Sequence, residues 1–520
     1  MTSGMSAEGS AFFDDPVRAV DELVSLYDAA VSDLLTSYRE ACDRVAAGGG
    51  IPEHVRRCYP EIRYTLGALG EVDPSLSHGF LDRPGEYGTT VARPALYRPY
   101  LEEQIWNILA NHGGEVEIRV SDCPIPILLV PGYNDVDTSE LTPVQLGMVE
   151  QAFDPVDSAL IDDAVADGEA DFLSLSVKPL SLFSAPRVDL ALERLEHYTG
   201  SSASYIQKFV LFTNYQLHTD VFLEYAHQLG RSDDPDVDPA VAAKGGESVR
   251  DLFAEPDLGE QPYEFLVAPG NNIYPVGVVP TDREVRADAS ACQMPAYHLV
   301  REGGLGVTII DIGVGASNAK TITDCLAVIR PHCWIMVGHC AGLDGRMEIG
   351  DMILGNGYDR SDGVLDRMVP LAKPIPPIAE VQRALEEAFA DVSGLEGEAL
   401  RRRFRTGTVH STADRNWEWQ PQSEIYRELQ KSTAIAVEME SATIATNGYR
   451  FRVPYGVLLS VSDKPLHNRP KLPGDAQRFY QASKVEHLMT AVRACEAMSA
   501  SPSGLHSRKL RRPVGEVAFR

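Results

Sequence analysis

A strand–helix–strand pattern between residues 306 and 338 constrains the fold of this chain more than any other feature. The apolar run 306–312 indicates a buried strand, and the glycine-containing stretch 313–318 separates it from apolar residues at helical spacing that stop before Pro331. A second apolar run, 333–338, follows. Two buried strands joined through a helix predict a parallel βαβ unit with a right-handed crossover. The C-terminal half is therefore expected to be an α/β domain with a central sheet.

The chain is long enough to hold more than one hydrophobic core. At 520 residues, two or three domains are expected. Strands and helices are mixed in the first part, so we predict an α+β N-terminal domain over residues 1–200, a larger α/β domain over 201–500 and a C-terminal tail over 501–520. Segment 231–261 is acidic, contains prolines and has few bulky apolar residues, which is typical of a surface loop or linker.

The N-terminal domain is expected to begin with a long helix. Asp15 suits the capping position, and Pro16 suits the first turn. Apolar residues then recur at helical spacing as far as the glycine run 48–50. This helix is expected to pack rather than to catalyse.

Charge and composition exclude several classes of partner. A formal net charge of −28 argues against nucleic acid, which needs a basic surface, but permits a small phosphorylated ligand held by a few arginines. No apolar run approaches ~18 residues, so no membrane span is expected, and the first residues lack a secretory signal. The eight cysteines are scattered without a CxxC pair, as in proteins with reduced thiols. We expect a cytoplasmic globular protein.

Acidic residues stand where two apolar runs end between residues 434 and 467. Glu438 and Glu440 follow the first run, and Asp463 follows the second. Ligands of open α/β sheets bind outside the carboxyl ends of strands, so these carboxylates are expected in one crevice. There they can bind sugar hydroxyls or donate a proton to a leaving group. The alternative is that Asp463 caps a turn and Glu440 caps a helix.

The glycine stretch 313–321 does not match the known phosphate-binding loops. A Walker loop needs a glycine directly before its lysine, and a dinucleotide fingerprint needs a third glycine; both are missing. A tight strand-to-helix turn remains, in which free N–H groups together with Ser317 and Asn318 suit an anion or a sugar oxygen. Simple turn chemistry is the alternative.

A second group suited to a phosphate lies in the N-terminal domain. Thr89, Thr90 and Arg93 combine two hydroxyls, a turn and one guanidinium. Solvated or paired side chains are the alternative. Trp417 suits stacking on a flat base, although tryptophans more often simply pack. No GxSxG elbow is present, which argues against an acyl hydrolase.

Two His-Cys pairs have only a superficial likeness to metal ligands. His332-Cys333 and His339-Cys340 are separated by one buried strand and are expected at its opposite ends. We therefore predict no metal site there, with both thiols as core residues.

Several motifs together resemble the nucleoside phosphorylase and nucleosidase superfamily. They are VEMESA (437–442), SDKP (462–465) and GVG-x-SNA (313–319). Within this superfamily, the chain resembles the AMP nucleosidase family more closely still. That likeness rests on HYTG (197–200), FVLFTNY (209–215) and TTVARP (89–94) in the N-terminal part, and on GHCAGL (338–343), IGD (349–351), RTGTV (405–409), DRNWE (414–418), GYRFRVPYG (448–456), KLPG (471–474) and HSRKLR (506–511) in the C-terminal part.

The resemblance implies a fold, a reaction and roles for the acids. It implies a three-layer nucleoside-phosphorylase-like catalytic domain with a central mixed sheet, which hydrolyses the N-glycosidic bond of AMP without metal or redox cofactor. Asp463 is expected to protonate N7 of adenine, which requires a raised pKa. Glu440 is expected to bind the ribose hydroxyls, with Met439 against the sugar and Glu438 nearby.

One departure from the superfamily favours water over phosphate as the nucleophile. Met336 and His339 occupy the positions where nucleoside phosphorylases can carry a phosphate-binding arginine, and the turn at 269–272 also lacks one. The 5′-phosphate of AMP is therefore expected at Thr89, Thr90 and Arg93. A phosphorolytic purine nucleoside phosphorylase and a catalytically silent nucleotide sensor are the alternative functions.

The resemblance further implies regulation and assembly. Activation by MgATP, inhibition by inorganic phosphate and a hexamer of identical chains are expected from it alone. The sequence does not locate the regulatory site or the interface.

Overall fold

The computed structural model describes residues 10–50, 52–229, 262–278, 289, 291–471, 473–505 and 510–520, with only the backbone described for 473–482. The acidic segment 231–261 therefore lies outside the described residues. The chain forms two compact units, residues 1–193 with 511–520, and residues 194–510.

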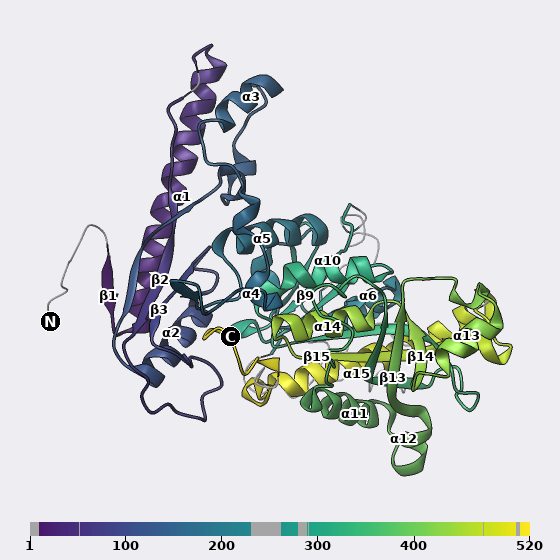
Figure 1. The fold of residues 1–520 in the computed structure, drawn as a ribbon. Helices are drawn as coiled ribbons and strands as arrows, with labels where there is room; N and C mark the ends of the chain where they lie inside the picture. The colour runs from purple at the N-terminus through teal and green to yellow at the C-terminus, as the bar shows by residue number, and fades with distance from the viewer. Residues whose placement is uncertain are drawn as a thin grey trace. The chain divides into compact units, whose positions relative to one another are not determined.

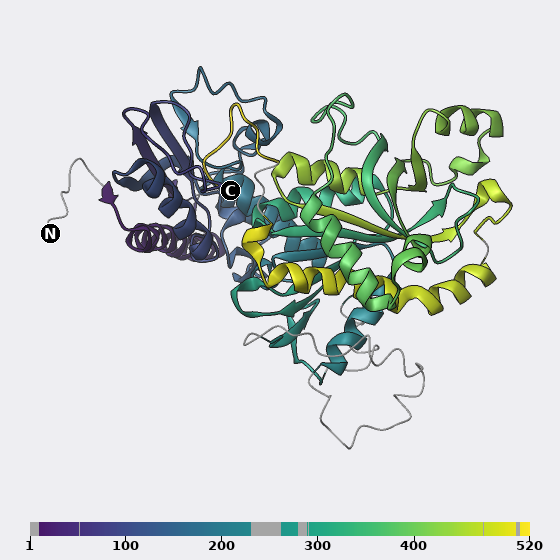
Figure 2. The same cartoon turned by 90° about the horizontal axis from the view of Figure 1, so that it is seen from below.

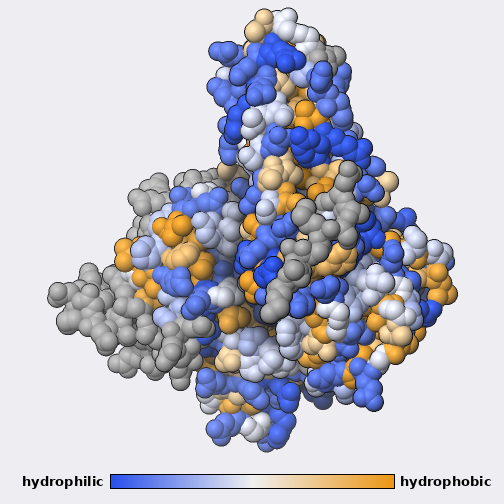
Figure 3. Space-filling view, turned by 90° about the vertical axis from the view of Figure 1, so that its left-hand side faces the viewer, coloured by the Kyte–Doolittle hydropathy of each residue, from blue (hydrophilic) through white to orange (hydrophobic). Residues whose placement is uncertain are grey.

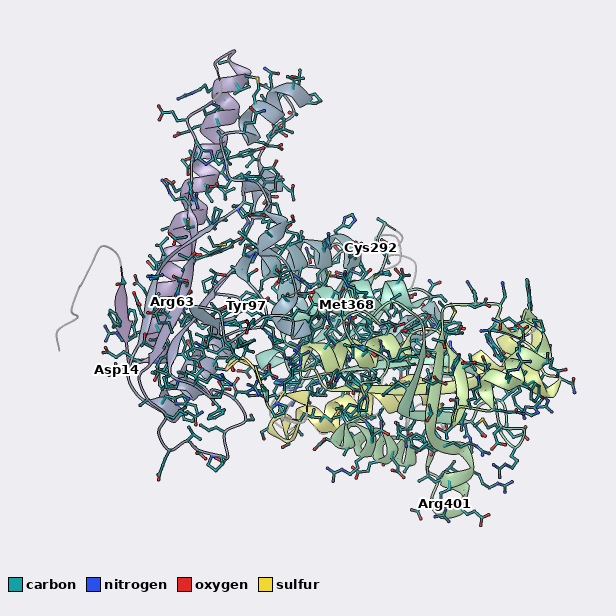
Figure 4. All side chains as sticks on the ribbon, viewed as in Figure 1. Asp14, Arg63, Tyr97, Cys292, Met368 and Arg401 are labelled. Carbon is teal, nitrogen blue, oxygen red and sulfur yellow. The ribbon has the colours of Figure 1, made fainter. Side chains whose placement is uncertain are left out.

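The first unit is built on a long helix and a mixed sheet (Figure 1). Helix α1 (Pro16–Ala46) begins as predicted, with the Asp15 carboxylate accepting from the backbone N–H of Val17 at 2.9 Å. Among the described residues, five strands form the sheet in the order β1-β4-β2-β3-β5. They are β1 (Ala11–Phe13), β2 (Cys58–Leu66), β3 (Gly85–Thr90), β4 (Val116–Pro124) and β5 (Val177–Pro179). Figure 4 shows Arg63 on this sheet, where it pairs with Glu61 at 3.1 Å.

Four further α-helices are described in the segment that leads to the second unit. They are α2 (Arg98–His112), α3 (Pro143–Glu150), α4 (Ala164–Asp167) and α5 (Ala185–Thr199). The division between the units falls at residues 193 and 194, inside α5. The boundary predicted at residue 200 stands at the end of the same helix.

The last residues of the chain are part of the first unit, which corrects the prediction of a C-terminal tail over 501–520. Val517, Ala518 and Phe519 are buried, and Ala518 and Phe519 belong to a core cluster with residues of α1 and the sheet. The backbone N–H of Phe519 donates to the carbonyl of Leu180 at 2.9 Å. Because the burial of apolar side chains holds residues 511–520 in this core, they are not a free tail.

The second unit contains a larger mixed sheet, as the sequence predicted. Among the described residues its ten strands run in the order β14-β13-β12-β15-β11-β6-β10-β9-β7-β8. They are β6 (Phe209–Thr213), β7 (Phe265–Ala268), β8 (Asn272–Pro275), β9 (Ala296–Val300), β10 (Val307–Asp311), β11 (Cys333–Gly342), β12 (Met352–Ser361), β13 (Phe404–Thr412), β14 (Ala434–Glu438) and β15 (Tyr455–Asp463). The predicted βαβ unit is confirmed as β10, helix α10 (Ala316–Leu326) and β11, although β6 lies between the two strands and pairs parallel with both.

One additional pairing brings the ends of distant strands together. β15 runs parallel to β11, with Asp463 opposite Ala341 at their carboxyl ends. β14 also pairs with the end of β11, where Val437 lies opposite Ala341. Strands β11, β15, β12, β13 and β14 therefore form a closed ring of pairings. This closure places the last residues of β11, β14 and β15 at one edge.

Helices cover both faces of this sheet and make the expected three layers. α10 and α14 (Ser441–Phe451) lie on one face, and α11 (Ala379–Ser393) and α15 (Pro473–Ser499) on the other (Figure 1). The view in Figure 2 shows α11 and α15 in front of the strands. Helix α6 (Gln216–Gln228) packs against α15, and α12 (Gly397–Arg403) and α13 (Gln422–Leu429) flank β13 in the sequence.

The surface of the protein mixes polar and apolar residues. On the face drawn in Figure 3, hydrophobic residues occur in small groups among hydrophilic ones. None of the described helices has the length and apolar character needed to span a membrane.

Candidate active site

A pocket of about 200 Å³ lies at the carboxyl ends of the strands in the second unit. The ends of β6, β11, β13, β14 and β15 supply most of its wall, as expected for an α/β sheet. Its lining residues are Asn214, Tyr215, Val314, His339, Cys340, Ala341, Thr412, Arg415, Trp417, Glu418, Val437, Glu438, Met439, Glu440, Ser462, Asp463 and Lys471. The three acids expected to share a crevice therefore do share one.

Glu438, the last residue of β14, is buried and already holds several hydrogen-bond donors. Its Oε2 accepts from the backbone N–H groups of Glu440 at 2.8 Å and Ser441 at 2.7 Å, and its Oε1 accepts from the Ser411 hydroxyl. The two backbone donors lie at the start of α14, so the Glu438 carboxylate caps this helix. In the structure its oxygens bind groups of the protein itself, and substrate contact by Glu438 stays a prediction.

Glu440 occupies the capping position of α14 but makes no capping bond with its side chain. Its Oε1 accepts from the backbone N–H of Gly315 at 2.6 Å, and its Oε2 accepts from Asn214 Nδ2 at 3.2 Å. Burial and the neighbouring Glu438 carboxylate raise the pKa of Glu440 to about 8. Because Glu438 has three donors and Glu440 has two, Glu440 holds the proton of this pair at neutral pH. When ionised, Glu440 can therefore accept further hydrogen bonds, and it lines the pocket.

Asp463 ends β15 and is 9% exposed. The Ser462 hydroxyl donates to its Oδ1 at 2.5 Å. Burial raises the pKa of Asp463, while the Ser462 hydrogen bond and the charge of Lys471 act in the opposite direction. A carboxyl group with a raised pKa stays protonated at higher pH, which is the property a general acid needs.

The pocket is also lined by the aromatic residue that the sequence singled out. Trp417, in the short helix η7 (Trp417–Trp419), lines the pocket together with Met439 and Thr412. A second hollow of about 420 Å³ is also lined by Trp417 and Thr412. Trp417 and Met439 thus lie where the sequence placed them, and their contact with a base and a sugar stays a prediction.

The turn between β10 and α10 reaches the pocket through different groups from those expected. Asn318 Nδ2 donates to the carbonyl of Ile312 at 3.0 Å, and Ser317 is exposed. Neither residue is among those that line the pocket, whereas Val314 is. The N–H of this turn that reaches an acceptor belongs to Gly315, and the acceptor is Glu440 Oε1 at 2.6 Å. The ligand contacts predicted for Ser317 and Asn318 stay predictions.

Thr89, Thr90 and Arg93 lie in the first unit, where their polar groups have internal partners. Thr90 Oγ1 accepts from the backbone N–H at the start of α5 at 2.9 Å, and Thr89 Oγ1 donates to the Thr90 carbonyl at 3.3 Å. Arg93 donates to Asp189 at 2.8 Å and to Glu193 at 2.5 Å. Two carboxylates already bind this guanidinium, so a phosphate would have to compete with them. The phosphate site predicted here stays a prediction.

Two cations that the sequence analysis did not single out line the pocket. Arg415 precedes η7 and is exposed, and no ion pair within the described residues involves it. Lys471 Nζ donates to the Tyr215 hydroxyl at 2.8 Å and lies 5.3 Å from the centre of that ring. Both side chains offer positive charge to a bound anion beside the acids.

Three buried histidines form a cluster next to the pocket. His339 of β11 lines the pocket, and His218 of α6 and His487 of α15 lie against it. Burial lowers the pKa of all three imidazoles, that of His487 to about 4, so they are neutral at neutral pH. His332 and Cys333 stand at the other end of β11, as expected. Its members are far apart in the chain, so no local sequence pattern indicates the cluster.

Asn214 lines the pocket but was not predicted from the sequence, although its position at the end of a strand could have indicated it. It directly follows β6, a buried strand, just as Asp463 ends β15. The rule that found the acids at strand ends therefore also applies to this amide. Arg415 and Lys471 stand in the motifs DRNWE and KLPG, but no described strand ends directly before either residue, so the same rule does not indicate them.

Two family models match separate parts of the chain. The one described as "Bacterial AMP nucleoside phosphorylase N-terminus" matches residues 18–174, and the one described as "Phosphorylase superfamily" matches residues 293–495. The second match covers β11, β13, β14 and β15 of the pocket wall but not β6, and it agrees with the nucleoside-phosphorylase-like fold of the second unit.

Curated relatives and solved structures extend this finding. The AMP nucleosidase of Escherichia coli (strain K12) is 40% identical over 526 residues, covering 99% of this chain and 100% of that protein. A 5′-methylthioadenosine/S-adenosylhomocysteine nucleosidase of Marinomonas sp. (strain MWYL1) is 25% identical over 168 residues, covering 32% of this chain and 72% of that protein. The match to the crystal structure of AMP nucleosidase from Bacteroides thetaiotaomicron VPI-5482 covers 60% of this chain and 97% of that protein. The two are 23% identical, with a TM-score of 0.40.

Proposed function

The chain belongs to the AMP nucleosidase family, and we propose that it hydrolyses the N-glycosidic bond of AMP, giving adenine and D-ribose 5-phosphate. The observation that carries this proposal is the meeting of Asp463, Glu440 and Met439 in one pocket at the strand ends. Full-length identity of 40% to an AMP nucleosidase supports the same reaction.

Asp463 is the proposed general acid. When the bond between C1′ and N9 breaks, its electron pair stays on the purine, which becomes an anion unless it is protonated. A proton delivered by Asp463 to N7 removes that charge, and the raised pKa of Asp463 keeps the proton available. Water adds its oxygen to C1′ and releases one proton, so that the carboxyl group can be protonated again. General acid catalysis of this kind is typically worth ~10²–10⁴-fold in rate.

Glu440 is the proposed acceptor for the ribose hydroxyls. It has two donors where Glu438 has three, and hydroxyl donors from the sugar would complete its set. Hydrogen bonds to a carboxylate favour its ionised form, so ribose binding is expected to displace the proton from Glu440. Asn214 would hold the carboxylate in place during this exchange.

We propose Arg415 and Lys471 as the groups that recognise the 5′-phosphate. Both line the pocket that contains the acids, and Arg415 is exposed to incoming ligand. The earlier candidate, Arg93, is engaged by two carboxylates in the first unit. A guanidinium suits bidentate binding of phosphate, which favours Arg415 as the main contact.

Product analysis separates this function from its alternatives. Purified protein would be incubated with AMP or adenosine, with and without labelled inorganic phosphate. Hydrolysis predicts adenine and ribose 5-phosphate from AMP, with no label in the sugar product. Ribose 1,5-bisphosphate would instead indicate the phosphorolytic reaction, and intact AMP at enzyme concentrations near those of the substrate would indicate a nucleotide sensor.

We further propose, from family resemblance, a cytoplasmic hexamer activated by MgATP and inhibited by inorganic phosphate, which acts in purine nucleotide salvage and control of the AMP level. Catalysis itself is proposed to need no cofactor. Light scattering on the purified protein tests the assembly, and initial rates with each effector test the regulation.

A further inference from the structure

We propose that His218, His339 and His487 form a binding site for a divalent first-row transition-metal ion, with Zn²⁺ as the preferred occupant. All three side chains are buried, and one ring nitrogen from each lies within 4.8 Å of the others. Neutral imidazole nitrogens are the ligands that zinc and related ions prefer in proteins. This inference does not depend on the proposed reaction.

The separations between the rings agree with a shared metal ion. The ring centres are 5.3 Å apart for His218 and His339, 5.0 Å for His218 and His487, and 5.5 Å for His339 and His487. Three imidazoles bound tetrahedrally at metal–nitrogen distances of about 2.0–2.1 Å have ring centres about 5 Å apart. The ring centres are therefore at separations that a shared ion allows, and the ligand nitrogens, which lie within 4.8 Å of one another, would be about 3.3 Å apart around a bound ion.

The hydrogen bonds of two of these histidines match those of metal ligands. His487 Nε2 lies 3.0 Å from the carbonyl oxygen of Leu458, so Nε2 carries the hydrogen and Nδ1 keeps its lone pair. His218 Nδ1 bonds the Thr213 hydroxyl at 2.7 Å. A second ring nitrogen held by a carbonyl or hydroxyl group is the usual support of a metal-binding histidine.

The remaining nitrogens of these two rings have nothing to bond. His487 Nδ1 and His218 Nε2 are buried and have no hydrogen-bond partner within the described part of the chain. Both atoms are therefore available to a bound species, and they belong to rings whose ligand nitrogens lie within 4.8 Å of one another. A metal ion satisfies lone pairs, and a water molecule is the alternative occupant.

The charges around the cluster define the kind of site. The charge of Lys471 lowers the pKa of His339, and the charge of Lys484 lowers the pKa of His218. No carboxylate is among the groups that shift the pKa values of the three histidines. Both lysines oppose a cation, so the affinity has to come from the three nitrogens. Three histidine ligands leave a fourth tetrahedral position for water or hydroxide.

The position of the cluster indicates what the ion would do. It would join α6, β11 and α15 directly behind the pocket, with His339 common to both sites. The ion is thus placed to fix the end of β11, which supplies Cys340 and Ala341 to the pocket wall. We infer a positioning role for it, with no bond to the reacting atoms.

Metal analysis of the full-length protein tests the proposal. The wild-type protein would be stripped with a chelator, loaded with Co²⁺ or Zn²⁺ and desalted, and bound metal measured by mass spectrometry. We expect about one ion per chain and, for Co²⁺, the visible absorption of a low-coordinate ion with nitrogen ligands, lost on addition of Zn²⁺. Wild-type protein that retains neither metal would overturn the proposal and leave water as the occupant.

Variants locate the ion within the protein. His218→Ala and His487→Ala should each weaken Co²⁺ binding by more than ~10²-fold, because removing a ligand costs more than losing a supporting hydrogen bond. His298→Ala is the matched control, since His298 is equally buried and bonds a threonine but lies outside the cluster. Retention of the ion by His218→Ala and His487→Ala, or its loss only in the control, would place the metal elsewhere and refute the site.

Discussion

The hydrogen bond from Asn214 to Glu440 should control how the activity of this enzyme depends on pH. Asn214 Nδ2 donates to Glu440 Oε2 at 3.2 Å and favours the ionised carboxylate. A hydrogen bond to a charged group contributes about 1.5–3 kcal/mol, and one pKa unit corresponds to about 1.4 kcal/mol. Because the donor–acceptor distance is long, we take the lower limit. Asn214→Ala is then expected to raise the pKa of Glu440 from about 8 by about one unit.

The sign of the effect on activity follows from which form of Glu440 binds ribose. The carboxylate accepts two hydroxyl donors, whereas the protonated group has lost part of its capacity to accept. Below the pKa of Glu440, kcat/KM is proportional to the ionised fraction, so a pKa one unit higher lowers kcat/KM about tenfold. Well above both pKa values Glu440 is ionised in either protein, and this loss disappears. The ratio of wild-type to variant kcat/KM should therefore fall from about 10 toward 1 with rising pH.

Adenine release from AMP, followed from about pH 6 to about pH 10, measures this ratio. Asn318→Ala is a suitable control, because Asn318 also carries a bonded amide near the pocket but donates to the carbonyl of Ile312. The Asn318→Ala substitution should leave the pH dependence of kcat/KM unchanged. A ratio for Asn214→Ala that is the same at every pH would refute the electrostatic role, and would instead indicate a direct contact of the amide with substrate.

Three further substitutions test the other assignments. Asp463→Asn should lower kcat by at least ~10²-fold and leave AMP binding nearly intact, so near-normal turnover would contradict its role as general acid. Arg415→Ala should raise KM for AMP ~10–150-fold more than for adenosine, whereas Arg93→Ala should affect both substrates alike; the reverse pattern would return the phosphate site to the first unit. Ser411→Ala removes a buried donor to Glu438, so urea unfolding should show a loss of about 1–3 kcal/mol, and unchanged stability would argue against that bond.

The sequence was sufficient for the features that depend on local pattern. The apolar runs before Asp463 and Glu438 predicted buried strands, and the carboxyl-end rule then predicted one crevice for both acids. Asp15 and Pro16 predicted the start of α1. Each of these inferences uses residues close together in the chain, where spacing and local chemistry determine the structure.

The features that were missed depend on contacts between segments far apart in the sequence. Asn214 and Glu440 are 226 positions apart, and their bond forms because β6 and β14 end at the same edge of the sheet. The histidine cluster likewise joins one strand to two helices. Residues 511–520 belong to the first unit because Phe519 is buried in its core, and no local sequence pattern predicts that burial.

The separate roles of Glu438 and Glu440 show why spacing alone does not assign function to an acid. The two residues have the same side chain and stand two positions apart at the start of α14. Burial raises the pKa of Glu438, but the free backbone N–H groups of that helix and the Ser411 hydroxyl bind its carboxylate and oppose the rise, so it serves as a structural cap. Because those donors are taken, Glu440 has fewer internal partners, holds the proton of the pair and gains the most from new donors. A ribose supplies such donors, and the helix cap thereby prepares its neighbour to bind the sugar.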